Sequence, residues 1–146
     1  MNNNIMRYKD RKFHFRGRVV RNDPMVNPSD GWVVGFYYQD LFNGEMKHFI
    51  RNSEMIWEVM PETVGKFIGY DTNDLEIYEG DILRNGLILI VVEYDENCCQ
   101  YVKHIYGVDE VNNAVVDGGT AAFLRGENIY MKKVGNIYDN KEMIRR

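Results

Sequence analysis

The sequence predicts an all-β protein built mainly from antiparallel strands. Ten tyrosines, seven phenylalanines and two tryptophans bring the aromatic content to 13% and the hydrophobic content to 45%. This composition favours strands and a packed core over disorder. Short apolar runs alternate at close intervals with turns rich in Gly, Asn and Asp, as in antiparallel sheets. We therefore expect small curled sheets with SH3-like barrel elements and a short C-terminal helix.

The chain of 146 residues has the length of one domain. A chain of this size buries roughly two thirds of the surface of its unfolded state, so its core requires neither a disulfide nor a metal. Pro61 separates two halves of the sequence. Two organisations remain open: a single domain over residues 1–146, or two β subdomains over about 1–61 and 62–146.

The first half contains four expected strands. Phe13–Val20 alternates aromatic and cationic side chains, as a half-buried strand does. A loop rich in turn residues precedes the second strand, Trp32–Tyr38. Asn43-Gly44 then closes a hairpin into Glu45–Ile50, because both residues tolerate the positive φ of a type I′ turn. Met55–Met60 is the fourth strand, where β-branched and aromatic side chains disfavour a helix.

The second half begins with strands at Val64–Gly69 and Glu76–Tyr78, separated by a turn. Glu79-Gly80-Asp81 is a sharp bend, in which we expect a positive φ at Gly80 and backbone N–H groups that donate to Asp81. A hairpin at Asn85-Gly86 leads into Leu87–Tyr94. The apolar run of that strand predicts cover on both of its faces.

The last third combines strands with a polar segment. Gly107–Gly119 is rich in Gly, Asn and Asp and predicts a mobile loop. A short helix closes the chain, since Asp139 followed by Glu142 resembles a capping box and Arg145 and Arg146 suit the negative end of a helix dipole. The expected strand segments are Cys99–Tyr106, Ala121–Leu124, Ile129–Val134 and Asn136–Tyr138.

The cysteines favour a reducing compartment. Cys98 and Cys99 are its only cysteines, and adjacent side chains on a strand point to opposite faces. We expect buried or half-buried thiols, with a redox role as the lesser alternative. The start, Met1-Asn2-Asn3-Asn4, does not resemble a signal peptide. The longest apolar run, Leu87–Val92, is shorter than the roughly 20 residues of a membrane-spanning helix.

Charge is unevenly distributed along the chain. Residues 1–21 carry seven basic residues and one acid, a net +6, and the remaining residues carry −10. The acidic body disfavours a broad phosphate-binding surface, although Arg16, Arg18 and Arg21 are candidate nucleic-acid contacts. The favoured alternative is an edge strand whose cations block aggregation or meet the acidic body of the same or a neighbouring subunit.

Three segments carry a family resemblance. They are the run from Thr63 to Leu83, which contains Thr-Val-Gly and Ile-Tyr-Glu-Gly-Asp-Ile, the run from Val134 to Met143, and Gly31–Tyr37. Together they resemble the YopX-like proteins of bacteriophages and prophages, a family without a settled biochemical activity. The resemblance implies a location in the cytoplasm of the bacterial host. Ile68, Tyr70 and Lys141 depart from its pattern without removing a catalytic group. The resemblance assigns structural roles to Thr63, Val64, Gly65, Gly69, Ile77, Tyr78, Glu79, Gly80, Asp81, Gly135, Asn136, Ile137, Asn140 and Glu142.

No motif specific to an enzyme, a metal site or a cofactor is found in the sequence. The acidic cluster Asp71, Asp74, Glu76, Glu79 and Asp81 lacks the spacing of a calcium loop, and we interpret it as turn residues with a backbone-capping Asp81. The histidines lie far apart and lack the spacing of zinc ligands, and no phosphate-binding loop or nucleophile elbow is present. We therefore expect no catalytic residue, no metal and no cofactor.

Three functions compete on this basis. The first is a phage or prophage accessory protein that forms a homo-oligomer and contacts phage or host proteins, as aromatic strands and opposite charges suggest. The second is a small-barrel nucleic-acid-binding module. The third is an enzyme that uses the acidic cluster. The first is favoured.

Overall fold

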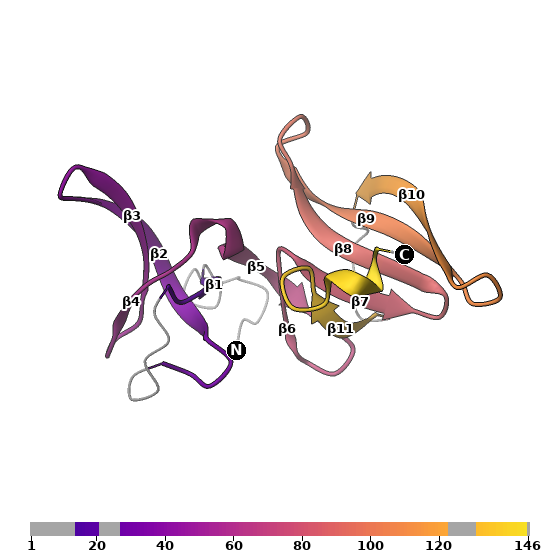
Figure 1. Cartoon of the computed structure of the whole chain (residues 1–146), viewed down its shortest axis with the longest axis horizontal. Coiled ribbons are helices and arrows are strands. Elements are labelled where there is room, and N and C mark those ends of the chain that lie inside the picture. Colours follow the sequence, from indigo (N-terminus) through magenta and orange to yellow (C-terminus); the bar gives the residue numbers. More distant parts are fainter. Residues whose placement is uncertain (1–13, 21–26, 123–130, 146) are drawn as a thin grey trace, which may run out of the picture. The chain divides into compact units, whose positions relative to one another are not determined.

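The computed structural model describes residues 14–20, 27–122 and 131–145 (Figure 1). The described strands pair antiparallel, which confirms the all-β prediction. The chain divides into two compact units, Met1–Phe67 and Ile68–Arg146. Pro61 begins a 3-10 turn, η2 (Pro61–Thr63), within the first unit. No helix in the described ranges is long and apolar enough to cross a membrane.

The first unit is built around one sheet. Its hairpin between β2 and β3 turns at Asn43 and Gly44, whose φ values of 53° and 80° confirm the predicted turn. Its strands have the order β4-β3-β2-β1-β5, and β5 runs past the end of this unit toward β6, which belongs to the second unit. The strand bounds are β1 Phe15–Arg18, β2 Trp32–Phe42, β3 Glu45–Arg51, β4 Ile56–Glu58, β5 Gly65–Tyr70 and β6 Glu76–Tyr78.

The core of the first unit lies on one face of this sheet. Val19, Val33, Ile50 and Val59 are buried there and form one cluster. Half-buried aromatic side chains such as Trp57 pack against it. Because side chains alternate between the two faces of a strand, the other face of β2 presents Val34 and Phe36, both of which are exposed.

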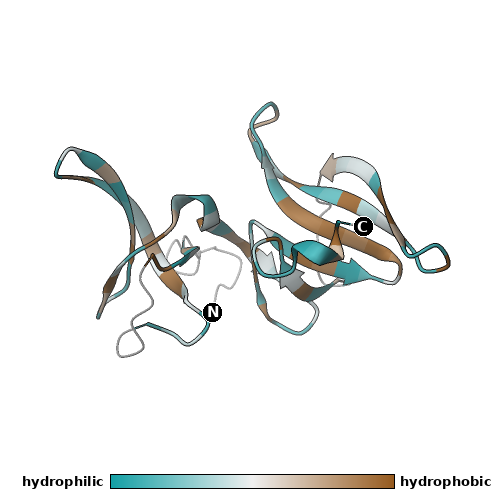
Figure 2. Ribbon diagram, viewed as in Figure 1, coloured by the Kyte–Doolittle hydropathy of each residue, from teal (hydrophilic) through white to brown (hydrophobic). Residues whose placement is uncertain are grey.

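The second unit contains a five-stranded sheet with β8 at its centre. Leu89 and Val91 are buried in one hydrophobic cluster, and Ile90 and Val92 in another. The predicted cover on both faces is therefore confirmed for Leu89–Val92, whereas Leu87 and Ile88 at the start of the run are exposed. Figure 2 shows this hydrophobic run. The sheet order is β10-β9-β8-β7-β11, with bounds β7 Asp81–Asn85, β8 Ile88–Asp95, β9 Gln100–Asp109, β10 Ala114–Ala122 and β11 Lys132–Asn136.

The predicted mobile loop at Gly107–Gly119 is wrong. Strand β9 continues to Asp109, and β10 starts at Ala114. The Asp109 carboxylate accepts hydrogen bonds from the backbone N–H groups of Val111 and Asn112, so the polar residues form a tight turn. Val108 pairs with Val115 directly beside that turn, and these β-branched residues extend the hairpin.

The predicted burial of the cysteines is also wrong. Cys98 and Cys99 are both exposed and lie in the turn between β8 and β9. The Asp95 carboxylate accepts hydrogen bonds from the N–H groups of Asn97 and Cys98, and Cys99 has a φ of 54°. The turn thus extends through Cys99, and β9 begins only at Gln100, which leaves both thiols in solvent.

The predicted C-terminal helix is only a 3-10 turn, η4 (Lys141–Met143). Asn140 occupies its N-cap without a side-chain capping bond, because the Asn140 side-chain oxygen accepts the backbone N–H of Asn136 instead. Asp139 accepts a hydrogen bond from the Asn136 side chain, so it does not cap a helix either. The predicted SH3-like barrel is not confirmed, since the described strands of the second unit form an open sheet that ends at β10 and β11.

Candidate functional site

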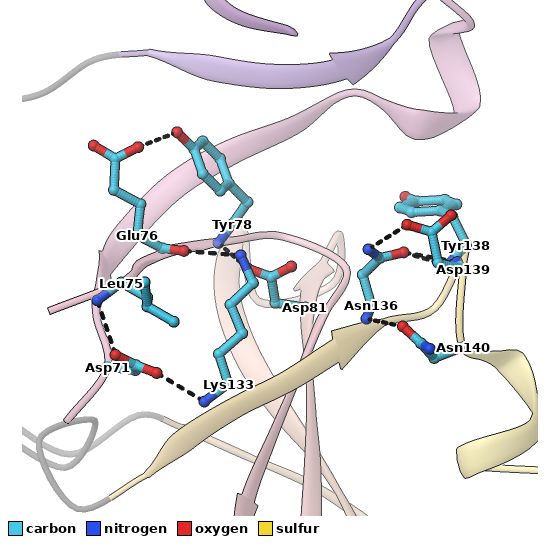
Figure 3. Close-up of polar contacts among 10 residues, drawn as sticks. All are labelled: Asp71, Leu75, Glu76, Tyr78, Asp81, Lys133, Asn136, Tyr138, Asp139 and Asn140. Atoms are coloured by element: carbon cyan, nitrogen blue, oxygen red, sulfur yellow. Dashed lines mark hydrogen bonds and ion pairs between the residues drawn. The ribbon is translucent and has the colours of Figure 1, made fainter. Parts of the chain in front are cut away.

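Most of the motif residues of the second unit meet at one polar junction. The bend between β6 and β7 packs against the segment that follows β11 (Figure 3). Gly80 joins them: its N–H donates to the Val92 carbonyl at 2.8 Å, and its carbonyl accepts the Ile137 N–H at 2.9 Å. The predicted positive φ at Gly80 is confirmed, with a value of 92°. A Cβ at this position would lie 2.9 Å from Cε2 of Tyr138, so glycine allows the close approach.

Asp81 occupies the centre of the junction and is fully buried. Its Oδ2 accepts the Tyr78 N–H at 2.7 Å, as the bend predicted. The same oxygen lies 3.2 Å from Nζ of Lys133, which also donates to the Glu76 carbonyl at 3.1 Å. A buried carboxylate is stable only when it is paired and hydrogen-bonded, and these contacts meet that requirement.

Asp71 contacts the backbone of Lys133 in β11, whereas Asp81 contacts its side chain (Figure 3). Its carboxylate accepts the N–H groups of Asn73 at 2.8 Å, Leu75 at 2.9 Å and Lys133 at 2.9 Å. Burial alone would raise the pKa of this carboxyl, but the three hydrogen bonds and the nearby Lys133 charge outweigh burial and lower the pKa. Asp71 therefore fixes both its own turn and the start of β11.

Asn136 orders the closing segment. Its side-chain oxygen accepts the N–H groups of Tyr138 and Asp139, and its amide nitrogen donates to the Asp139 carboxylate at 3.0 Å. The Asn140 side chain accepts the Asn136 N–H, and the Asn140 N–H donates back to the Asn136 carbonyl. A Cβ on Gly135 would lie 2.4 Å from the Asn140 side-chain oxygen, so this exchange requires glycine at that position.

The acidic cluster is therefore divided among separate structural contacts. Asp71 and Asp81 bind backbone N–H groups, the Glu76 carboxylate accepts the Tyr78 hydroxyl, and Asp74 lies in the turn with a φ of 60°. Glu79 is half-buried in the bend. Within the described ranges, no three His, Cys, Asp or Glu side chains are arranged to hold a metal ion.

The other motif residues are spread over both units. Thr63 is buried, and its hydroxyl accepts the Arg18 N–H at 2.9 Å and donates to the Met60 carbonyl. Gly65 pairs with Arg16, and Val64 packs against the core of the first unit. The remaining positions are Gly69 in β5, Ile77 and Ile137 against the two cores of the second unit, and Glu142, exposed in η4.

The candidate nucleic-acid contacts do not form an open cationic surface. Arg16 is buried, and its guanidinium lies 4.6 Å from the ring centroid of Trp32. Arg18 is half-buried at 4.7 Å from the same ring. Both guanidinium groups therefore make cation–π interactions with Trp32, and these interactions stabilise the sheet. Arg21 lies outside the described residues.

Exposed apolar side chains instead gather on β2, β3 and β4. Phe36, Arg51 and Ile56 lie side by side across the three strands, and Val34 is on the same face. Phe36 is 68% exposed, and Val34 and Ile56 are exposed as well. We call Val34, Phe36 and Ile56 the apolar row. This row was not predicted, although Trp32–Tyr38 carries apolar residues at both alternating positions and so signals a second apolar face.

A second apolar group lies at the end of the β2–β3 hairpin, which extends from the first unit as a two-stranded ribbon (Figure 1). Strand β1 pairs with β2 only at Trp32–Gly35, and β4 pairs with β3 only at Phe49–Arg51. The His48 carbonyl, opposite Gln39, also accepts the N–H of Val59 at 2.9 Å. We call the ribbon beyond this bond, residues 40–47, the arm. Leu41 and Met46 are cross-strand partners in the arm, and both are exposed, as is Phe42.

Comparison with known proteins agrees with the three motif segments. The family model described as YopX protein matches residues 14–145. No curated protein and no solved structure matches the chain at a significant level. Because the family model covers nearly the whole chain, this protein belongs to the YopX protein family.

Proposed function

We propose that the protein is a non-catalytic phage or prophage accessory protein that acts by self-association and protein contacts. The observation that carries this proposal is the apolar row, together with the arm. Large apolar side chains that are exposed close together, as Val34, Phe36 and Ile56 are, are typical of an interaction surface. Phe36 and Ile56 flank the exposed Arg51, and aromatic and arginine side chains are the residues that most often dominate binding energy at interfaces.

The arm supports the same proposal. A two-stranded ribbon without a third strand is marginally stable in water, and this one exposes Leu41, Phe42 and Met46 near its turn. A partner that covers these side chains removes their apolar surface from water and stabilises the ribbon. Burial of one such side chain contributes about 1.5 to 3 kcal/mol.

Charge supports contacts between copies. Residues 1–67 carry ten basic and eight acidic residues, a net +2, and residues 68–146 carry eight basic and fourteen acidic residues, a net −6. Opposite charges on the two halves favour contacts between unlike surfaces of neighbouring subunits. The bacteriophage or prophage context follows from the family resemblance. The cytoplasm of the bacterial host suits exposed, reduced thiols at Cys98 and Cys99.

The proposal of a non-catalytic role is supported by the polar junction. The carboxylates that offered the least improbable catalytic group, Asp71 and Asp81, serve backbone N–H groups and one lysine. A carboxylate whose oxygens are engaged in this way is poorly placed to take a proton from a substrate.

Sedimentation velocity on two variants tests the assembly proposal. The double variant with Phe36→Ser and Ile56→Ser removes two of the three apolar side chains of the row, and we expect it not to form the wild-type oligomer. Leu87→Ser is the matched control, because Leu87 is an exposed leucine in the second unit, and it leaves the oligomer intact. An unchanged mass for the double variant, with a folded circular dichroism spectrum, contradicts an assembly role for the row.

Nucleic-acid binding is the second candidate, and one observation favours it. The exposed Phe36 and Arg51 are cross-strand partners, and aromatic and arginine side chains on a sheet form stacking platforms for single strands. Fluorescence anisotropy with a labelled single-stranded oligonucleotide tests it. Binding must weaken as salt rises and must be lost in Arg51→Ala; no binding at low salt rejects this candidate.

A further inference from the structure

His104 lies between two carboxylates on the sheet of the second unit. Its Nε2 is 2.7 Å from Oδ1 of Asp117 on β10, and its Nδ1 is 3.2 Å from a carboxylate oxygen of Glu93 on β8. The imidazole is stacked on the ring of Tyr106, with centroids 4.6 Å apart and planes 7° apart. One side chain of β9 thus connects the strands on both sides of it.

A β-bulge places Asp117 in this contact. The pairing of β10 with β9 shifts between Asp117 and Thr120, where Gly118 and Gly119 add an irregularity. Gly119 has a φ of 81°, and its N–H donates to Oδ1 of Asp117 at 2.8 Å. That oxygen is the one that meets His104, so the bulge both directs the carboxylate and holds it in place.

The number of protons on His104 decides how many of these contacts it can make. A protonated imidazole has two N–H donors, so it donates to Glu93 and Asp117 at once. A neutral imidazole has one donor and one acceptor, so one ring nitrogen then presents a lone pair to a carboxylate. Asp117 is the closer partner, and its contact retains the proton, whereas the Glu93 contact becomes repulsive.

The charges that face His104 among the described residues come from both neighbouring strands. Burial lowers the pKa of His104, but hydrogen bonds to Asp117 and Glu93 and the charges of both carboxylates outweigh burial, so its pKa is raised. The hydrogen bond from Gly119, followed by that from His104, lowers the pKa of Asp117. Burial, and then the charges of Glu93 and Asp117, raise the pKa of Tyr106, which stays neutral beside the imidazole.

We propose that Glu93, His104 and Asp117 form a pH-dependent clamp that holds β8, β9 and the bulged part of β10 together while His104 is protonated. Loss of the proton releases Glu93 and weakens the bond to Asp117, and β10 is then held less tightly. This clamp is a regulatory property of the second unit, and it does not depend on the function proposed above.

The direction of the pH dependence follows from the two shifts. A raised histidine pKa gives stabilisation that is complete below the ordinary value of 6.5 and is lost as the pH rises through the folded-state pKa. A lowered aspartate pKa gives stabilisation that is present above the ordinary value of 3.8 and is lost at lower pH. As the pH rises above 6.5, the clamp therefore opens as His104 loses its proton.

Nuclear magnetic resonance on the full chain tests the clamp. The Hε1 signal of His104, assigned by its absence in His104→Gln, is followed against pH in the wild type and in Asp117→Asn and Glu93→Gln. We expect His104 to titrate above 6.5 in the wild type and at lower pH in each variant. Glu110→Gln is the control, because this exposed carboxylate lies in the turn of the same hairpin and contacts Arg84, and it leaves the titration unchanged.

Hydrogen exchange gives an independent second readout. Protection factors of the β10 amides should fall between pH 6 and pH 8.5 in the wild type, by at most tenfold for each unit of pKa rise, and should be insensitive to pH in Asp117→Asn. If His104 titrates at or below 6.5, or if both variants leave its titration unchanged, the proposal is wrong. Unchanged protection of the β10 amides while His104 titrates would also overturn the proposal, because the contact would then not stabilise β10.

Discussion

In the second unit, individual polar side chains stabilise the backbone of tight bends. One example is the bend at Gly80, whose positive φ few residues other than glycine adopt. Asp81 and Gly80 could be predicted from the sequence because their roles are local: a bend leaves N–H groups unpaired, and an adjacent carboxylate accepts them. The roles of Lys133 and Asp71 could not be predicted, because they depend on contacts between residues far apart in the chain. The Lys133 N–H donates to Asp71, and the Lys133 ammonium group pairs with Asp81. No spacing rule connects such positions, and only the paired strands bring them together.

Asp81→Asn tests the role of the buried carboxylate. The substitution keeps the shape of the side chain but removes the charge that pairs with Lys133. We expect the free energy of unfolding to fall by about 2 to 3 kcal/mol, the typical loss for a hydrogen-bonded charged group. Urea unfolding followed by tyrosine and tryptophan fluorescence measures it. Glu142→Gln, at an exposed motif position, should stay within about 0.5 kcal/mol of the wild type; equal effects of the two changes would contradict the account.

Gly80→Ala and Gly86→Ala separate steric crowding from backbone strain. Both glycines have a positive φ, 92° and 60°. A Cβ at Gly80 meets Tyr138, whereas nothing lies within 4 Å of a Cβ at Gly86. We expect Gly86→Ala to cost about 1 kcal/mol of unfolding free energy and Gly80→Ala about 2 to 3 kcal/mol. Thermal unfolding of the two variants measures the difference, and a larger loss for Gly86→Ala would show that Tyr138 does not confine the bend.

Whole elements were predictable where local chemistry determines them. The Asn43-Gly44 hairpin, the strand Glu76–Tyr78 and the covered β8 agree with expectation. The β9–β10 hairpin was missed because its glycines and aspartates signal a loop, while its stability comes from cross-strand pairs and from one Asp side chain in the turn. The helix at the chain end was overpredicted, because Asn136 and Asn140 use the groups that would otherwise cap it.

The Asp71 turn makes a prediction about acid stability. Because the folded-state pKa of Asp71 is lowered, its stabilising contribution is present above the ordinary value of 3.8 and is lost as the pH falls through the folded-state pKa. We expect the urea midpoint of the wild type to decrease below about pH 4. Asp71→Asn should be less stable at neutral pH and should decrease less steeply with acid. If the urea midpoint of both proteins decreased equally steeply with acid, the three backbone hydrogen bonds to Asp71 would not contribute to stability.

At the scale of the whole molecule, composition predicted the fold class but not which surface is exposed. Aromatic content indicates strands, yet it does not distinguish a residue in the core, such as Trp57, from one in solvent, such as Phe36. The family match covers residues 14–145 and agrees with the motif segments. The apolar row and the arm, which carry the functional proposal, became visible only with the strand pairings.

Light scattering coupled to size-exclusion chromatography, at low and moderate salt and with absorbance at two wavelengths, tests self-association most directly. We predict a discrete oligomer, free of nucleic acid, that persists at micromolar concentration. A monomer at that concentration would contradict the proposal. A species that carries nucleic acid until salt removes it would also contradict it and would favour the second candidate function.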